Sequence, residues 1–213
     1  KAIAEPRRRR RELLAFHERI AAMTFFDPAC GSGNFLTETY LSLRRLENEV
    51  VRAAAVDTAD MAVLGEAFTP IRVSIDRFYG IEINDFAVVV ARTAMWIAET
   101  GMKRETVSIV HHDLDFFPLR SEAHIAEDNA LRLDWRTVCP APDYIIGNPP
   151  FVGYSLQSKE QKEDLLSVYV DESDKPYKAT GKIDYVAGWY FKAAEMMQGP
   201  PIRAALVSTN SIT

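Results

Sequence analysis

Hydrophobic residues recur along this chain with two spacings that alternate. Stretches with helical spacing are followed by short, continuous apolar runs that are typical of buried strands. The apolar positions of the predicted helices are Leu13, Phe16 and Ile20; Leu36, Tyr40, Leu43 and Val50; Phe86, Val89, Val90 and Ile97; and Tyr185, Trp189, Ala193 and Met196. This alternation indicates a parallel sheet covered by helices, so we predict a doubly wound, Rossmann-like α/β fold.

The predicted strands span residues 24–26, 78–83, 144–146 and 204–207, and a further core strand is expected at either 107–110 or 124–126. Gly101 is expected to close the third helix, because glycine commonly ends helices. Residues 56–76 are less regular than their surroundings. We expect the sheet to be truncated after its fifth strand.

Size and composition favour a single folded domain. The chain has 213 residues, of which 47% are hydrophobic and 26% charged, enough to bury one core. We assign residues 1–22 to an N-terminal helix and 23–213 to the rest of the domain. Because the sequence opens at Lys1 without a methionine and stops after an apolar run, we expect flanking domains in a longer parent chain.

Several classes of protein are disfavoured. No apolar run is long enough to cross a bilayer, and the arginine-rich N-terminus lacks the apolar stretch of a signal peptide. Cys30 and Cys139 form neither a disulfide framework nor a zinc pattern, so we expect a cytoplasmic protein without a structural metal. The net charge of −5 is unusual for a protein that binds nucleic acid, so any DNA contact must be local or made by another domain.

A glycine-rich motif follows the first predicted strand. Its nine residues are Asp27, Pro28, Ala29, Cys30, Gly31, Ser32, Gly33, Asn34 and Phe35. The glycines permit a sharp turn and close approach to a ligand, and the following helix offers free N–H groups to an anion. A dinucleotide site would need a third glycine where Leu36 stands. The acid at Asp27 would repel a pyrophosphate but suits the ammonium group of S-adenosylmethionine, whose carboxylate can meet the loop amides.

Glu82 and Ile83 stand at the end of the second predicted strand. A carboxylate at this place can accept hydrogen bonds from both ribose hydroxyls of a nucleotide-type cofactor. Glu82 lies farther from the glycine loop than the usual spacing of about 20 residues, and an insertion within residues 56–76 could account for the difference.

A second motif, Gly147-Asn148-Pro149-Pro150-Phe151, directly follows the fourth predicted strand. The prolines stiffen the backbone and remove two donors, so the loop presents acceptors. The Asn148 side-chain oxygen and the Pro149 carbonyl could accept both hydrogens of an exocyclic amine and localise its lone pair toward a methyl donor. A base in a duplex would have to flip out to reach them, and Phe151 could stack on it.

Both motifs resemble those of adenine-N6 DNA methyltransferases, and 27–36, 78–86 and 146–153 resemble the MmeI-like restriction-modification enzymes more closely. The resemblance implies the class I S-adenosylmethionine-dependent fold and the gamma order of motifs. It also implies double-stranded DNA as substrate, together with target-recognition and possible endonuclease domains in the parent chain. It further implies that Asn129, Ala130 and Leu131, after the third strand, read the cofactor adenine. Because Asn replaces the commoner aspartate, Asp128 and Asp113 stay open as alternatives to Asn129.

Other features have weaker interpretations. The arginines from Arg7 to Arg11 could touch phosphates, but such a run is usually a solvated face. His111 and His112 beside Asp113 lack further ligands at metal-binding spacing. Tyr154 and Lys159 are equally compatible with a border of the target site and with exposed loop positions. Asp184 is most simply a helix N-cap, and Trp189 a core residue.

Three functions remain open from the residues alone. The first is methyl transfer to adenine N6 in DNA, with cytosine N4 as a subsidiary target because its amine presents the same two hydrogens. The second is methylation of a glutamine amide in a protein, and the third is a non-catalytic module within a restriction assembly.

Overall fold

The structure is a computed structural model that describes residues 4–56, 69–110, 121–170, 173, 175–177 and 182–209. Within these residues the strands form one sheet in the order β3-β2-β1-β4-β5, and every pairing is parallel. The strands are β1 (Phe25–Asp27), β2 (Phe78–Glu82), β3 (His124–Glu127), β4 (Tyr144–Gly147) and β5 (Arg203–Leu206). The predicted doubly wound α/β fold is confirmed.

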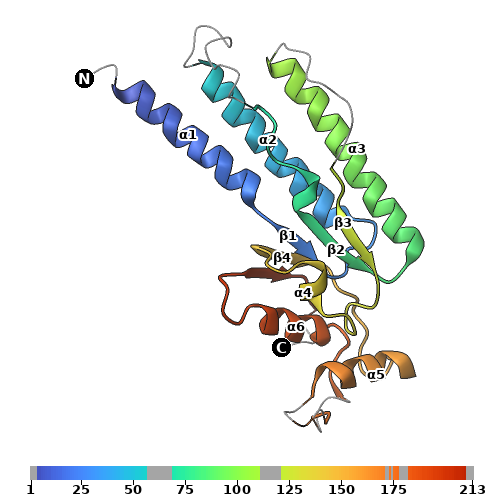
Figure 1. The fold of residues 1–213 in the computed structure, drawn as a ribbon. Helices are drawn as coiled ribbons and strands as arrows, with labels where there is room; N and C mark the ends of the chain where they lie inside the picture. The colour runs from blue at the N-terminus through green and yellow to red at the C-terminus, as the bar shows by residue number, and fades with distance from the viewer. Residues whose placement is uncertain are drawn as a thin grey trace.

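Helices cover both faces of the sheet (Figure 1). On one face lie α1 (Ala4–Ala22), α2 (Asn34–Val56) and α3 (Asp85–Val110), which extend well past the strands. The other face is covered by α4 (Trp135–Val138) and α6 (Ala187–Met196), with α5 (Lys159–Val168) farther from the sheet. A short 3-10 turn, η2 (Ile75–Arg77), leads into β2.

Alternation along the strands divides the core into two clusters. Phe25 packs with the α1–α3 side, whereas its neighbour Phe26 packs with Trp135 and Trp189 on the other side. In β4, Ile145 faces the second cluster while Tyr144 packs against the first. Successive side chains of a strand point to opposite faces, and here both faces are covered. This explains why the strands read as continuous apolar runs rather than alternating ones.

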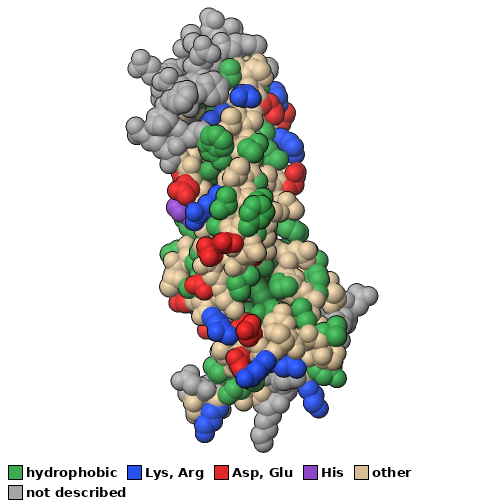
Figure 2. Space-filling model, turned by 90° about the vertical axis from the view of Figure 1, so that its right-hand side faces the viewer, with side chains coloured by type: hydrophobic (Ala, Val, Ile, Leu, Met, Phe, Trp, Pro, Cys, Tyr) green, Lys and Arg blue, Asp and Glu red, His purple; other side chains and the backbone are tan. Residues whose placement is uncertain are grey.

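The sequence prediction was wrong about the inward face of α3. Phe86, Val89 and Ile97 are 73%, 60% and 60% exposed, whereas the residues buried against the core include Met95 and Met102. Figure 2, which looks onto the side where α3 lies in Figure 1, shows hydrophobic side chains among charged ones along this side. α3 is apolar on more than one side, so periodicity alone could not select the face that packs.

The proposed end of α3 at Gly101 was also wrong, and so was the alternative strand at 107–110. The helix continues to Val110, and β3 takes the other predicted place. A glycine inside a helix costs only about 1 kcal/mol relative to alanine. Here the buried side chains of Met102, Thr106 and Val110 continue the packed face beyond the glycine, which offsets that cost.

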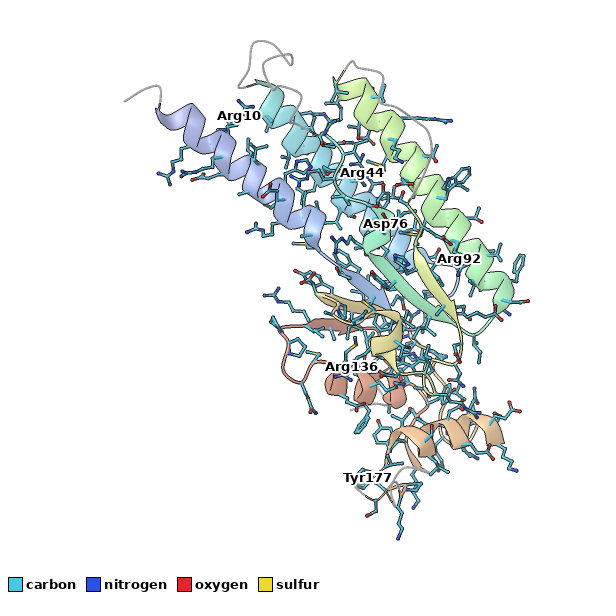
Figure 3. All side chains as sticks on the ribbon, in the orientation of Figure 1. Arg10, Arg44, Asp76, Arg92, Arg136 and Tyr177 are labelled. Carbon is cyan, nitrogen blue, oxygen red and sulfur yellow. The ribbon has the colours of Figure 1, made fainter. Side chains whose placement is uncertain are left out.

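A buried polar network joins the three long helices. Arg44 of α2 points toward α3 (Figure 3) and donates to Thr106 Oγ1 at 2.7 Å. Its guanidinium also pairs with Glu47, whose carboxylate accepts from the backbone N–H groups of Arg72 and Val73. His17 of α1 contacts the same carboxylate at 2.6 Å. These contacts tie α1 and the segment before β2 to α2.

The strand order reverses between β1 and β4, because β2 lies on the other side of β1; this place is the topological switch point of the sheet. Connections lead away from such a switch in opposite directions and leave a crevice at the carboxyl ends of the strands, where doubly wound folds bind ligands. Asp27, Glu82 and Gly147 end three of these strands. Among the helices described, none is long and apolar enough to span a membrane.

Candidate functional site

A cavity of about 1060 Å³ opens at the carboxyl ends of the strands. Its lining includes Pro28, Ala29 and Gly31 of the glycine loop; Glu82 and Ile83; Asp128, Asn129 and Ala130; Asn148 and Pro150; Asp164 of α5; Tyr185 of the segment before α6; and Trp189 of α6. Segments separated by more than a hundred residues therefore meet around one space. The two sequence motifs contribute to the same cavity.

Two left-handed glycines shape the loop between β1 and α2. Gly31 and Gly33 have φ values of 55° and 81°, a region that disfavours residues with a side chain. A Cβ at Gly33 would also lie 3.0 Å from the Cβ of Ala91, so this glycine lets α3 approach the loop. The turn closes with a 2.8 Å bond from Gly33 N to Cys30 O, and α2 starts immediately afterwards.

Asp27 lies beneath the loop and is 1% exposed. Its Oδ1 accepts from Ala29 N at 3.0 Å. Burial raises the pKa of Asp27 to about 7, and the negative charge of Glu82 adds to the rise, although the bond from Ala29 opposes it. The chain makes room for this carboxylate at Gly147, where a Cβ would lie 2.5 Å from Oδ1. Asp27 therefore connects the end of β1 to the end of β4.

Glu82 supports the loop from the end of β2. Its Oε2 accepts from Gly31 N at 2.9 Å, and its Oε1 accepts from Asn84 N at 2.9 Å. Each carboxylate oxygen retains capacity for a further donor, and the side chain lines the cavity. The carboxylate thus has the chemistry to accept ribose hydroxyls while it holds the turn in place.

The chain leaves β4 at Gly147, whose carbonyl accepts from Val207 N at 2.9 Å, and then enters the Asn148-Pro149-Pro150-Phe151 loop. Asn148 and Pro150 line the cavity, Pro149 is buried and Phe151 is 42% exposed. Val152 O, which follows the loop, accepts from Tyr185 N at 2.9 Å and from Gln157 Nε2 at 3.3 Å. The bond from Tyr185 secures the end of the loop to the segment before α6, and Gln157 links it to the same segment because its Nε2 also donates to Ile183 O at 2.8 Å.

α6 also holds two other walls of the cavity. Trp189 Nε1 donates to Pro28 O at 2.9 Å, and Lys192 Nζ donates to the carbonyls of Leu131 and Leu133. Burial lowers the pKa of Lys192. The interpretation of Trp189 as a core residue is correct, since it is buried. The sequence did not predict the hydrogen bond from its indole N–H to Pro28 O. Sequence periodicity shows that a tryptophan is buried and does not reveal where its N–H points.

Asp164 of α5 was not anticipated at all. It is 3% exposed, and its carboxylate accepts from Asn129 Nδ2 at 3.0 Å, Tyr185 Oη at 2.8 Å and Arg132 Nε at 2.5 Å. Burial alone would raise the pKa of Asp164, but these hydrogen bonds outweigh it and hold the pKa below its usual range. No signal in the sequence singles out this residue among the charged residues of α5.

The predicted site residues are not all at the cavity. Asn34 and Phe35 instead line a separate hollow on α2, together with Phe25 and Leu46. Cys30 is buried, and burial raises the pKa of its thiol, so it is an unreactive packing residue. A Cβ at Gly80 would lie 2.9 Å from the Cys30 sulfur, which explains why β2 has a glycine at this position.

The structure also locates several of the residues that the sequence singled out less firmly. Asp184 is not the N-cap of α6: Val186 holds that position without a side-chain bond, and Asp184 Oδ1 accepts from Tyr154 N at 3.2 Å. Tyr154 is exposed, and Lys159 pairs with Glu163 on the surface of α5. His111, His112 and Asp113 lie outside the described residues. Among the residues described, no cluster of His, Cys, Asp or Glu could hold a metal ion.

Comparison with known proteins identifies the family. The model of the family described as MmeI, DNA-methyltransferase domain, matches residues 3–213. The chain belongs to this family. DNA methyltransferase A of Bacillus subtilis (strain 168) is 40% identical to this MmeI-type domain over 201 residues, which are 92% of the chain and 22% of that relative. The predicted MmeI-like family is therefore confirmed.

A solved structure agrees with this family assignment. The Type IIL restriction-modification enzyme MmeI in complex with DNA is 41% identical to the chain and superposes with a TM-score of 0.84. The match covers 95% of this chain and 26% of the MmeI chain. This MmeI-type domain thus spans about a quarter of the length of the proteins it matches.

Proposed function

We propose that this domain transfers the methyl group of S-adenosylmethionine to the N6 amine of adenine in DNA, as part of a restriction-modification protein. One observation carries the proposal: Asn148 and Pro150 line the same cavity as the glycine loop and Glu82. A cofactor held by the loop and an amine held by Asn148 would therefore share one space.

The residues around the cavity fit S-adenosylmethionine. Among the described residues that line the cavity are several carboxylates and one guanidinium, that of Arg132, a balance of charge that favours a cationic ligand. The Glu82 carboxylate can accept hydrogen bonds from the ribose hydroxyls. Asn129 and Ala130 line the same cavity, and we assign the adenine ring to them. The Asp27 carboxylate, beneath the loop, would favour the ammonium group electrostatically.

When bound, S-adenosylmethionine supplies a methyl group on a sulfonium, which is already a strong methyl donor. The task of the chain is therefore to align the amine rather than to deprotonate it first. The Asn148 side-chain oxygen and the Pro149 carbonyl accept the two amine hydrogens and direct the lone pair. The rigidity of Pro149 and Pro150 keeps these acceptors in place before the base arrives.

Access to this cavity requires a flipped base, because the exocyclic amine of a paired adenine is held within the duplex. Phe151 follows the cavity-lining Pro150 in the chain, is partly exposed and would stack on the flipped ring. The acids around the cavity and the net charge of −5 disfavour DNA phosphates. We therefore assign most backbone contacts and sequence recognition to the remainder of a longer protein; the MmeI structure that this domain matches over 26% of its chain is a complex with DNA.

Nucleoside mass spectrometry tests the proposal. Unmethylated DNA is incubated with S-adenosylmethionine and the full-length protein, in parallel with Asn148→Ala and with Ser155→Ala, an exposed residue of the following loop. We expect N6-methyladenine with the native protein and with Ser155→Ala, but none with Asn148→Ala. Binding of S-adenosylhomocysteine should survive in Asn148→Ala, because the substitution removes an acceptor for the base.

Other outcomes would overturn parts of the proposal. Methylated cytosine would keep the mechanism and change the base. Full turnover by Asn148→Ala would refute the assigned role of the loop. No methylated nucleoside with any variant would leave a glutamine amide or a non-catalytic role as the better interpretation.

A further inference from the structure

We propose that Asp164 is a positioning residue that sets the orientation of the Asn129 amide and thereby the preference of the cavity for an adenine ring. This inference rests on the function proposed above. It follows from the hydrogen bonds at the two ends of the Asn129 amide and from the other donors to Asp164.

The two ends of the Asn129 side chain have different obligatory partners. Its Oδ1 accepts from Leu131 N at 2.9 Å, and its Nδ2 donates to Asp164 Oδ2 at 3.0 Å. A backbone N–H can only donate and an ionised carboxylate can only accept, so both partners require the same orientation of the amide. If the amide turned over, its NH₂ group would face the N–H of Leu131 and its oxygen would face the Asp164 carboxylate. Both contacts would be repulsive, so Asp164 fixes the orientation.

The fixed orientation determines what the cavity offers to a ligand. A carbonyl oxygen can accept two hydrogen bonds, and Leu131 N uses one position on Oδ1. The remaining position is an acceptor, which matches the exocyclic amine of adenine. A 6-oxo purine presents an acceptor at the same place, so two oxygens would face each other with no hydrogen between them, a mismatch that a polar site discriminates strongly.

Asp164 itself is held from three directions. Tyr185 and Arg132 donate to it in addition to Asn129, and Arg132 forms the ion pair across to α5. Tyr185 also donates its backbone N–H to Val152 O, directly after the Asn148-Pro149-Pro150-Phe151 loop. Hydrogen bonds therefore hold the Asp164 carboxylate in place, and through Tyr185 it connects the turn at Asn129 to the end of that loop.

Replacing Asp164 by asparagine keeps the shape and removes the charge. In Asp164, Oδ1 accepts from the cationic Arg132, and Oδ2 accepts from Asn129 and Tyr185. The single oxygen of the new amide goes to the charged donor, because charged donors form the stronger hydrogen bonds. Its NH₂ group then takes the place of Oδ2 and faces the NH₂ group of Asn129. The Asn129 amide must then reverse or move away. Either change removes the acceptor offered to the adenine amine.

Isothermal titration calorimetry on the full-length protein tests this inference. The ligands are S-adenosylhomocysteine and its 6-oxo analogue, S-inosylhomocysteine, and the readout is the ratio of their Kd values. We expect the native protein to prefer the adenine ligand by about tenfold or more, a preference worth about 1.4 kcal/mol. Asp164→Asn should reduce the ratio to about threefold or less. Glu49→Gln, at an exposed acid of α2 that does not line the cavity, should keep the native ratio.

Two further variants separate positioning from general damage to the fold. Asn129→Asp should lose the preference for adenine at neutral pH, because it sets two carboxylates against each other. The double variant Asn129→Asp with Asp164→Asn should regain it, because the pair is again complementary with the polarity exchanged. If Asp164→Asn fails to fold, Asn129→Asp still tests the inference, since native-like preference in that variant would overturn it.

The possible failures are distinguishable. A native protein that binds neither ligand contradicts the proposed function together with this inference. A native protein that binds both ligands equally contradicts the assignment of Asn129 to the adenine ring and the inference built on it. An unchanged ratio in Asp164→Asn, or an equal weakening of both ligands, overturns the role of Asp164 alone.

Discussion

The indole Nε1 of Trp189 donates a 2.9 Å hydrogen bond to the carbonyl oxygen of Pro28, across 161 positions of the sequence. Pro28 is buried in the loop that forms one wall of the cavity. The same indole ring packs edge-on against Tyr185, which in turn contacts Asp164. One aromatic residue of α6 therefore links the cofactor loop to α5.

Trp189→Phe should weaken binding of S-adenosylhomocysteine by about tenfold. The substitution leaves a buried carbonyl without a donor, which costs about 1–3 kcal/mol and loosens the loop. Isothermal titration calorimetry provides the measurement. Trp96→Phe, on the exposed side of α3, is the matched control and should bind as the native protein does. Equal affinity in both variants would show that the loop does not depend on this bond.

Phe151→Ala should reduce kcat/KM for DNA while cofactor affinity stays unchanged. Stacking of a base on an aromatic ring contributes about 1–3 kcal/mol, so a loss of about 5- to 150-fold is expected. The control is Phe86→Ala, which removes an exposed phenylalanine from α3. An unaltered kcat/KM in Phe151→Ala would remove stacking from the proposed mechanism.

Gly147→Ala should destabilise the domain by about 1–3 kcal/mol, because the added methyl group would meet the Asp27 carboxylate inside the core. Gly101→Ala is the opposite case. No atom lies within 4 Å of its added Cβ, and alanine should stabilise α3 by about 0.5–1 kcal/mol. Urea unfolding of the two variants beside the native protein checks both signs, and similar midpoints for both would contradict the crowding at Gly147.

The buried Asp27 carboxyl predicts a dependence of stability on pH. Its pKa rises from about 3.8 to about 7 on folding, so the folded protein binds a proton that the unfolded chain has lost. The stability of the native protein relative to Asp27→Asn should therefore be highest near pH 4, fall as the pH rises to 7, and change little above it. Chemical denaturation at a series of pH values measures this difference, and a flat difference would place the Asp27 pKa near its ordinary value.

Asp27→Ala should bind S-adenosylmethionine more weakly than the native protein, because it loses both the bond to Ala29 N and the negative charge beneath the loop. Asp27→Asn separates the two effects, because it keeps an acceptor for Ala29 N and removes the charge. Equal weakening in both variants would indicate the charge, whereas weakening in Asp27→Ala alone would indicate the shape of the loop.

Local sequence was sufficient for the features that depend on near neighbours. The strands β1, β2, β4 and β5 were predicted to within one or two residues, because short apolar runs between helical segments are typical of buried strands. The two motifs were predicted at strand ends, where Asp27 and Gly147 indeed stand. The roles of the individual motif residues stay predictions, which the experiments above address.

The sequence by itself thus determined the fold class, the family and the two loops that supply the chemistry, since each is encoded by residues close together in the chain. Only the tertiary structure decided which side of α3 packs, how Asp27 and Gly147 fit together, and that Asp164 meets Asn129. These relationships depend on contacts between distant segments. A buried aspartate on α5 has the same local sequence signature as its exposed neighbours, and only the packing of α5 against the 129–132 turn and Tyr185 distinguishes it.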